Sequence, residues 1–229
     1  MGTDRIVFLF DVDNTLLDND HVVADLMRHL EHAVGHERQQ RYWAIFEQLR
    51  VELGYADYLG ALQRYRLENP REPHLLAVSS FLLDYPFANR LFPNAIDVIQ
   101  RSKQWGMPVV FSDGDVVFQP HKVERSGLFA EVEGNALIYV HKEKELDDVS
   151  SRFPADHYIL IDDKLRILDA VKREWGAKVT TVFPRQGHYA LDQAEIAKYP
   201  PADLVIDRIG MMLDYDLDAL LQAARIRRP

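Results

Sequence analysis

Cysteine is absent from this 229-residue chain, which excludes disulfide bonds, thiolate nucleophiles and cysteine-ligated zinc. Positive charge is in deficit, because 27 Lys and Arg stand against 36 Asp and Glu, for a formal net charge of −9. That balance argues against sequence-independent binding to nucleic acid or to an anionic membrane. The N-terminal apolar run, residues 6–10, stops at Asp11 and is too short for a signal peptide or a membrane span. We expect a soluble cytoplasmic protein that binds neither nucleic acid nor membrane.

Two common nucleotide-binding fingerprints are also missing. The sequence contains no GxxxxGK[ST] phosphate loop, and no GxGxxG follows the first apolar run. What the chain does have is material for a core, since 47% of its residues are hydrophobic. Its length fits one domain, or a domain of about 150 residues that carries an insertion.

Much of the chain alternates β-rich apolar runs with helical patterns, each bounded by turn residues. This alternation is typical of an α/β protein with a parallel sheet. The expected strands are residues 6–10, 108–111, 136–140, 158–161, 178–182 and 204–206. The expected helices are residues 95–105 behind an Asn94 cap, 116–126, 144–152, 165–175 and 213–224.

Residues 19–90 follow a different pattern. They contain no strand-like run, and their apolar residues recur at spacings of three and four. One such stripe consists of Val22, Leu26, Leu30 and Val34. We therefore predict an all-helical insertion, residues 19–90, within an α/β core formed by residues 1–18 and 91–229.

The most informative motif is FLFDVDNTLL, residues 8–17, in which a buried apolar strand runs into Asp11 and Asp13. Side chains two apart on an extended chain share one face, roughly 7 Å from each other. The two carboxylates can therefore converge on one cation or one substrate atom. A strand followed by an Asx turn is the alternative interpretation, because Asp, Asn and Thr all favour turns. Asn14 suits such a turn, since asparagine tolerates a positive φ.

Polar residues also follow the other predicted strands. They are Ser112 and Asp113 after the second strand, His141, Lys142 and Lys144 after the third, and Asp162 and Asp163 after the fourth. Ligands of open parallel sheets bind beyond the carboxyl ends of the strands. These residues are therefore expected along one rim of the sheet.

The order and spacing of these strand ends resemble the haloacid dehalogenase superfamily over nearly the whole chain. Its first motif, hhhhDxDxT, is similar to residues 8–15, and its second, a strand ending in Ser or Thr, is similar to VVFSDG with Ser112. The fourth motif, an acidic pair, is similar to ILIDDK, and either Lys142 or Lys144 fills the third. The insertion resembles the family's helical cap in its C1 position. The resemblance implies a Rossmann-like, three-layer parallel sheet with an inserted all-helical cap.

The resemblance also implies a phosphatase that acts on a small phosphorylated metabolite through an aspartyl-phosphate. Asp11 would be the nucleophile, and Asp13 would protonate the leaving oxygen and then accept a proton from water. Lys142 would neutralise the phosphoryl oxygens, and Ser112 would donate a hydrogen bond to one of them.

Magnesium is the implied cofactor, because an anionic nucleophile needs a hard divalent cation to approach a phosphoryl group. Asp11 would bind it through its carboxylate and Asp13 through its backbone carbonyl. Of the acidic pair, either Asp162 or Asp163 would be the direct ligand. Both residues can also cap the helix expected at residues 165–175.

Other interpretations stay open. A dehalogenase is disfavoured, because halide displacement needs no leaving-group acid such as Asp13. A phosphonatase is disfavoured too, because it uses a cap lysine and residues 19–90 contain none. A catalytically inert regulatory or binding module on the same fold is a further alternative. Ser112 can cap a turn, and Arg185 and His188 are most simply surface-loop residues. The substrate is not encoded, and a homodimer is compatible with the sequence.

Overall fold

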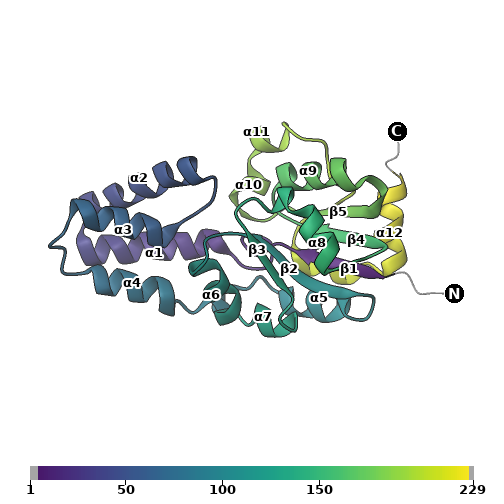
Figure 1. Cartoon of the computed structure of the whole chain (residues 1–229), viewed down its shortest axis with the longest axis horizontal. Helices are drawn as coiled ribbons and strands as arrows, with labels where there is room; N and C mark the ends of the chain where they lie inside the picture. The colour runs from purple at the N-terminus through teal and green to yellow at the C-terminus, as the bar shows by residue number, and fades with distance from the viewer. Residues whose placement is uncertain (1–4, 227–229) are drawn as a thin grey trace.

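The computed structural model describes residues 5–226, with residues 224–226 by backbone alone. Parallel strands form one six-stranded sheet in the order β3-β2-β1-β4-β5-β6 (Figure 1). The strands are β1 (Ile6–Phe10), β2 (Met107–Asp113), β3 (Ala136–Tyr139), β4 (His157–Ile161), β5 (Val179–Pro184) and β6 (Leu204–Ile206). The predicted parallel α/β fold is confirmed, and each strand lies within two residues of its predicted range.

Helices come from two parts of the chain. Those of the insertion are α1 (Asn19–Val34), α2 (His36–Leu53), α3 (Tyr58–Glu68) and α4 (Leu75–Asp84), followed by the 3-10 turn η1 (Phe87–Arg90). Those of the core are α5 (Ala95–Ser102), α6 (Phe118–Arg125), α7 (Leu128–Glu131), α8 (Leu146–Arg152), α9 (Leu165–Trp175), α10 (Gly187–Leu191), α11 (Gln193–Ile196) and α12 (Leu217–Ile226). Further 3-10 turns in the core are η2 (Lys142–Lys144), η3 (Gly176–Lys178) and η4 (Ile209–Asp214).

Several helix ends and one cap differ from the predictions, and α6 and α8 each begin two residues later than expected. Asn94 does not cap α5 with its side chain; its backbone is left-handed at φ 65° instead. Helix α5 ends at Ser102, whose hydroxyl donates to the carbonyl of Ile99 at 2.7 Å and so competes with the helical pattern. The last helix begins at Leu217, because residues 209–214 form η4, which packs against α5.

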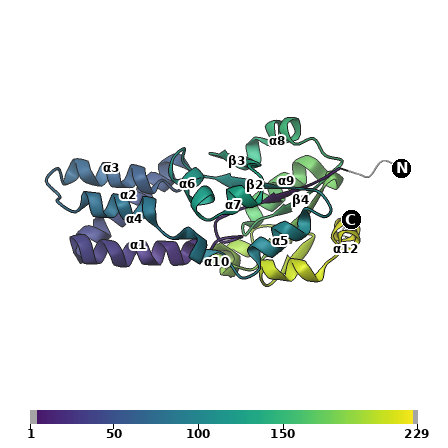
Figure 2. The ribbon, with the colours of Figure 1, turned by 90° about the horizontal axis from the view of Figure 1, so that it is seen from below.

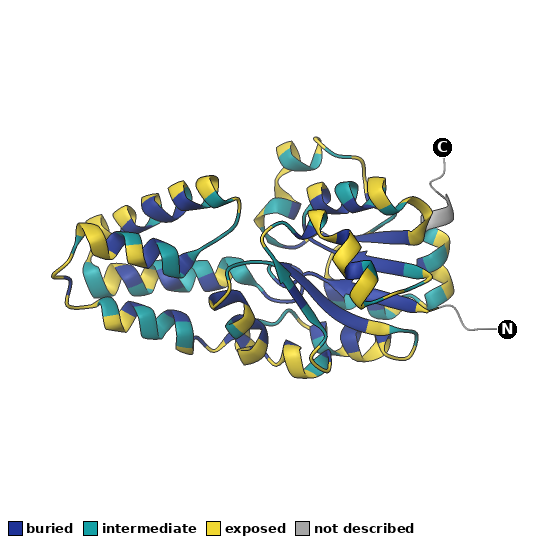
Figure 3. Cartoon of the chain, viewed as in Figure 1, coloured by how far each residue is buried: buried dark blue, intermediate teal, exposed yellow. Residues whose placement is uncertain are grey.

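The two faces of the sheet carry separate apolar cores, and the strands between them are largely buried (Figure 3). Phe8 and Phe10 of β1 point to the face covered by α5, α6, α7 and α12, whereas Val7 and Leu9 point to the face covered by α8 and α9. The connections from β1 to β3 run over the first face, and those from β3 to β6 run over the second. The direction of winding therefore reverses between the neighbouring strands β1 and β4, where ligand crevices form in such sheets.

The insertion lies beside the sheet as a group of four helices, α1 to α4 (Figure 2). Its apolar core continues into the first face of the sheet. Phe118 of α6 links them, with its ring 5.1 Å from that of Tyr58 and 5.7 Å from that of Phe87. Across the described part of the chain, no helix combines the length and apolar character needed to cross a membrane.

Candidate active site

Three buried aspartates meet where β1 and β4 end. Asp11, Asp162 and Asp163 are each at most 2% exposed, and one carboxylate oxygen from each lies within 4.8 Å of the others. The register explains this proximity, because the two strands are hydrogen-bonded neighbours and the N–H of Asp11 donates to the carbonyl of Ile161 at 3.0 Å. Ionised carboxylates this close repel one another unless a cation offsets their charge.

Lys142 supplies one such cation. Its Nζ donates to Oδ1 of Asp11 at 2.5 Å and to the carbonyl of Phe111 at 3.0 Å, and it lies 2.7 Å from Oδ2 of Asp162. Burial acts to lower the pKa of Lys142, but Asp11 and Asp162 outweigh it and hold that pKa above its ordinary value. Lys144, the other candidate for the third motif, is exposed. The fold thus brings Lys142 to the carboxylates.

Asp163 differs from its neighbour, because both of its carboxylate oxygens are buried without a hydrogen-bond partner among the described residues. Asp162 instead accepts the N–H of Lys164 at 2.8 Å, the turn contact that its position before a helix allowed. A buried carboxylate with unsatisfied oxygens is costly. A hard cation with oxygen ligands would satisfy it, so Asp11 and Asp163 fit a Mg²⁺ site, with Asp162 as the partner of Lys142.

The turn of the first motif holds these strand ends together. Asn14 is left-handed at φ 60°, as its position predicted. Thr15 donates from Oγ1 to Oδ2 of Asp11 at 3.2 Å and accepts the N–H of Asp163 at 3.0 Å. One hydroxyl therefore connects the carboxyl ends of β1 and β4.

Asp13 belongs to a second group of charges. Its carboxylate accepts a hydrogen bond from Lys122 Nζ at Oδ1, at 2.7 Å, and Gln119 Nε2 lies 3.4 Å from Oδ2. Gln119 also donates to Oγ of Ser112 at 2.9 Å. Neither Lys122 nor Gln119 was predicted from the sequence to lie at the site. Their signal was a polar pair three residues apart on the helix after Ser112, where side chains share one face.

Ser112 and its neighbour connect the two groups. The hydroxyl of Ser112 is buried and donates weakly to the carbonyl of Asp113 at 3.3 Å. Oδ1 of Asp113 accepts the N–H of Lys142 at 2.7 Å, and burial raises the pKa of the Asp113 carboxyl. Gln119 therefore links Ser112 to Asp13, and Asp113 is hydrogen-bonded directly to Lys142.

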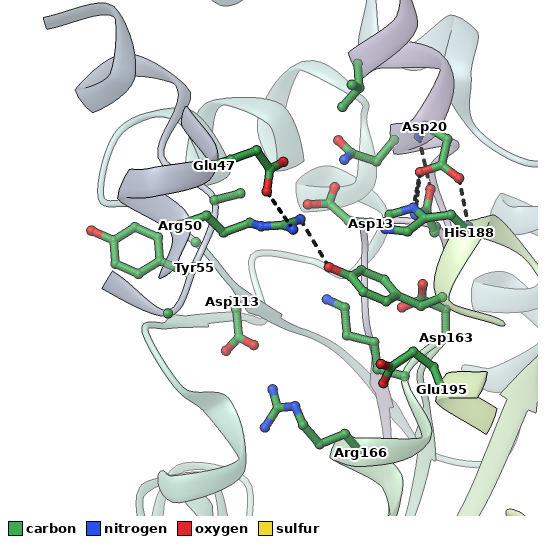
Figure 4. A pocket seen from close by; sticks show the side chains of 18 of the residues that line it. Asp13, Asp20, Glu47, Arg50, Tyr55, Asp113, Asp163, Arg166, His188 and Glu195 are labelled. Carbon is green, nitrogen blue, oxygen red and sulfur yellow. Dashed lines mark hydrogen bonds and ion pairs between the residues drawn. The ribbon is translucent and has the colours of Figure 1, made fainter. Parts of the chain in front are cut away.

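A cavity of about 740 Å³ opens between the insertion and the core (Figure 4). Its core wall includes Asp13, Asp113, Asp163 and Lys164, and its insertion wall includes Phe46, Arg50, Tyr55 and Tyr58. Asp11, Ser112 and Lys142 are not among the lining residues but lie next to them. A carboxylate oxygen of Asp11 lies within 4.8 Å of one of Asp163, Ser112 is hydrogen-bonded to Gln119, and Lys142 is hydrogen-bonded to Asp113.

Lys164 adds a cation to this cavity. Burial acts to lower the pKa of Lys164, but the charges of Asp163 and Asp11 outweigh it and raise that pKa above its ordinary value. With Lys164, three lysine ammonium groups face five aspartate carboxyl groups around the strand ends. The groups are Asp11, Asp13, Asp113, Asp162, Asp163, Lys122, Lys142 and Lys164.

Helix α10 ties the core to the insertion at two points. His188 donates its backbone N–H to Asp20 at 2.8 Å, and its Nδ1 lies 2.6 Å from the same carboxylate. Arg50 donates to the hydroxyl of Tyr189 at 3.2 Å (Figure 4). His188 is exposed, as a surface position predicts, and it also lines the cavity. Arg185 instead lies 3.7 Å from Asp207 and is not among the residues that line the cavity.

The acidic pair predicts how stability depends on pH when no metal is added. Burial raises the pKa of Asp162 to about 6 and that of Asp163 well above its ordinary value. The folded state therefore binds these protons more tightly than the unfolded state, whose carboxyls titrate near pH 4 (about 3.9). The stability that Asp162 contributes is present below about pH 4 and is lost as pH rises through about 6, and Asp163 acts in the same direction.

We expect the melting temperature in chelator to fall between about pH 4 and about pH 7, and saturating Mg²⁺ to remove most of that fall. Thermal unfolding followed by circular dichroism across that window checks this. If the melting temperature depends on pH in the same way with chelator and with Mg²⁺, then Asp162 and Asp163 do not bind the ion.

Comparison with known proteins agrees with this fold. A family model for haloacid dehalogenase-like hydrolases matches residues 7–182. Among solved structures, the chain is similar to a protein from Burkholderia xenovorans described as a haloacid dehalogenase-like hydrolase, with 60% identity over 93% of this chain and 99% of that chain and a TM-score of 0.89. No curated protein matches the chain.

More distant structures share the fold alone. One is the HAD-hydrolase YfnB from Bacillus subtilis, solved with magnesium and described as revealing interdomain movement; it has 16% identity over 93% of this chain and 98% of that chain, with a TM-score of 0.60. Another is the L-2-haloacid dehalogenase of Xanthobacter autotrophicus, with 17% identity over 98% of this chain and all of that chain, and a TM-score of 0.56.

The parallel sheet, the helical insertion and the acidic strand ends define a hydrolase of the α/β class. The chain belongs to the haloacid dehalogenase-like hydrolase family.

Proposed function

We propose that this hydrolase is a Mg²⁺-dependent phosphatase that cleaves a small phosphoric monoester through an aspartyl-phosphate on Asp11. The main support for the proposal is the buried carboxylate of Asp163 beside Asp11, which has no hydrogen-bond partner among the described residues. Such a carboxylate calls for a cation, and a cation is needed where a carboxylate attacks an anionic phosphoryl group. Displacement of a halide from a haloacid has no such requirement at the reacting centre. Asp13 supports the same choice, because only a leaving alkoxide needs a proton.

In the first half-reaction, a carboxylate oxygen of Asp11 attacks phosphorus and forms a P–O bond as the bond to the leaving oxygen breaks. Protonated Asp13 gives its proton to that leaving oxygen. Bound Mg²⁺, held by Asp11, Asp163 and the backbone carbonyl of Asp13, would supply charge neutralisation. Lys142 and Ser112 would serve as further donors to the phosphoryl oxygens.

In the second half-reaction, water attacks the phosphorus of the aspartyl-phosphate. Asp13, now a carboxylate, accepts a proton from that water as the P–O bond to Asp11 breaks. Inorganic phosphate leaves, and Asp11 and Asp13 return to their starting states.

Access to Asp11 requires movement, because this residue is 2% exposed and lies behind the cavity wall. The two contacts of α10 with the insertion, at Asp20 and at Arg50, are among those that a displacement of the insertion would break. The interdomain movement described for YfnB supports such a displacement.

Turnover of p-nitrophenyl phosphate and of a panel of small phosphate esters tests the proposal. We expect Mg²⁺-dependent phosphate release that falls by about 10²-fold or more in chelator, because a bound cation supplies several kcal/mol. The same preparation is assayed for chloride release from 2-chloropropionate. Chloride release without phosphate release would identify a dehalogenase, and neither activity, with no binding of fluoroberyllate, would indicate an inert binding module.

A further inference from the structure

Helix α6 contains a lysine whose side chain is completely buried. The side chain of Lys122 is 0% exposed, and its Nζ lies 5.2 Å from the ring centre of Phe118. Taking an ammonium group out of water is costly unless a counter-charge and hydrogen-bond acceptors offset the cost. Its hydrogen bonds go to Oδ1 of Asp13 at 2.7 Å and to Oδ1 of Asn19 at 3.0 Å.

The two oxygens of Asp13 are held unequally. Oδ1 receives the short, charge-assisted bond from Lys122, whereas Oδ2 has only the 3.4 Å contact with Gln119. The Asp13 side chain is 25% exposed and lines the cavity, whereas Lys122 does not line it. Lys122 therefore lies behind the carboxylate and cannot itself touch a substrate in this arrangement.

We propose that Lys122 positions Asp13 for proton transfer to the leaving group, with Oδ1 anchored and Oδ2 as the oxygen that carries the proton. This inference rests on the proposed phosphatase function. When protonated Oδ2 gives its proton to the leaving oxygen, the P–O bond breaks and Asp13 becomes a carboxylate. The ammonium of Lys122 is already in place to stabilise that carboxylate without rearrangement. Gln119 assists by limiting rotation of the group and by tying it to Ser112.

A purely structural role is the competing explanation, since Lys122 also joins α6 to the start of α1 through Asn19. The dependence of rate on the leaving group separates the two roles. A structural defect lowers the rate for all substrates alike. Loss of a positioned acid affects alkyl phosphates, whose leaving oxygen needs a proton, far more than p-nitrophenyl phosphate, whose leaving group does not.

The test is Lys122→Met, assayed with p-nitrophenyl phosphate, phenyl phosphate and an alkyl phosphate. We expect kcat/KM to fall by about 10²-fold for the alkyl phosphate and by only a few-fold for p-nitrophenyl phosphate. The matched control is Lys172→Met in α9, which removes a 2.7 Å ion pair between Lys172 Nζ and Asp203. That control should show the same small change for every substrate. Equal losses for all leaving groups in Lys122→Met would overturn the proposal.

A second variant avoids leaving the partly buried carboxylate of Asp13 without its partner. In an Asp13→Asn background, Lys122→Met removes both charges together, and no acid remains to be positioned. We expect the double variant to be as active towards p-nitrophenyl phosphate as Asp13→Asn alone, because the lysine acts only through Asp13. A further tenfold loss would overturn the proposal. If the unaltered enzyme releases no phosphate from any ester, the proposed function fails and this inference fails with it.

Discussion

Asp11→Asn is expected to abolish phosphate release, with a loss of roughly 10⁴-fold or more in kcat, because an amide cannot form the aspartyl-phosphate. The fold should survive. The amide oxygen of the asparagine can still accept the hydrogen bond from Lys142, and its NH2 group can donate to the hydroxyl oxygen of Thr15. The change also removes one of three clustered buried carboxylates. Steady-state release of phosphate from p-nitrophenyl phosphate measures the loss, and circular dichroism checks the fold.

Acid-quenched enzyme provides a second readout for Asp11. After mixing with a labelled phosphate ester, the unaltered chain should retain covalent label and Asp11→Asn should retain none. Asp156→Asn is the matched control, since Asp156 is half-exposed and pairs with Arg5; it should behave like the unaltered enzyme. Retention of more than about 1% of kcat by Asp11→Asn would assign the attack to another group.

Asp163→Asn is expected to separate metal binding from folding. In chelator, the variant should be more stable than the unaltered chain by about 1–3 kcal/mol, because it removes a buried carboxylate without a partner. With Mg²⁺ the order should reverse. An ion at 100 times its dissociation constant stabilises the protein that binds it by about 2.7 kcal/mol, and the variant should gain almost nothing.

Thermal melts of both proteins, with chelator and with Mg²⁺, measure this reversal. A change of 1 kcal/mol corresponds to roughly 2–4 °C in a chain of this size. Asp148→Asn, at an exposed position on α8, is the control and should keep the full response to Mg²⁺. If Asp163→Asn still responds, the ion is bound elsewhere, and Asp162 becomes the first residue to test.

These two expectations depend on different parts of the cluster. Asp11 is held by Lys142 and Thr15, so its carboxylate is satisfied before any ion arrives. Asp163 has no such contacts, so an ion is its natural partner. Asp11 is therefore oriented as a nucleophile without metal, whereas Asp163 is suited to bind the metal.

Much of the fold and the rim was predictable, because the signals were local. The alternation of apolar runs and helical patterns located all six strands, since a buried parallel strand must be continuously apolar. Asn14 was placed in a left-handed turn because few residues tolerate that conformation. The polar residues after the strands were predicted to lie on one rim, because a parallel sheet presents all its carboxyl ends on one side.

The pairing of charges was not predictable from local signals. Lys122 and Asp13 are 109 residues apart, and their contact depends on β2 lying beside β1 so that α6 starts behind the first motif. The choice between Lys142 and Lys144 depended on η2, which buries the first and exposes the second. The difference between Asp162 and Asp163 depended on the turn into α9, where only Asp162 accepts the N–H of Lys164.

The sequence by itself therefore determined the class of fold and the identity of the residues on the active rim, because strand periodicity and turn chemistry act over a few neighbouring residues. Only the tertiary structure decided which carboxylate is paired with which lysine and which is left for a cation. The physical reason is that a charge is satisfied by atoms in space, and those atoms are brought together by strand order and crossover geometry.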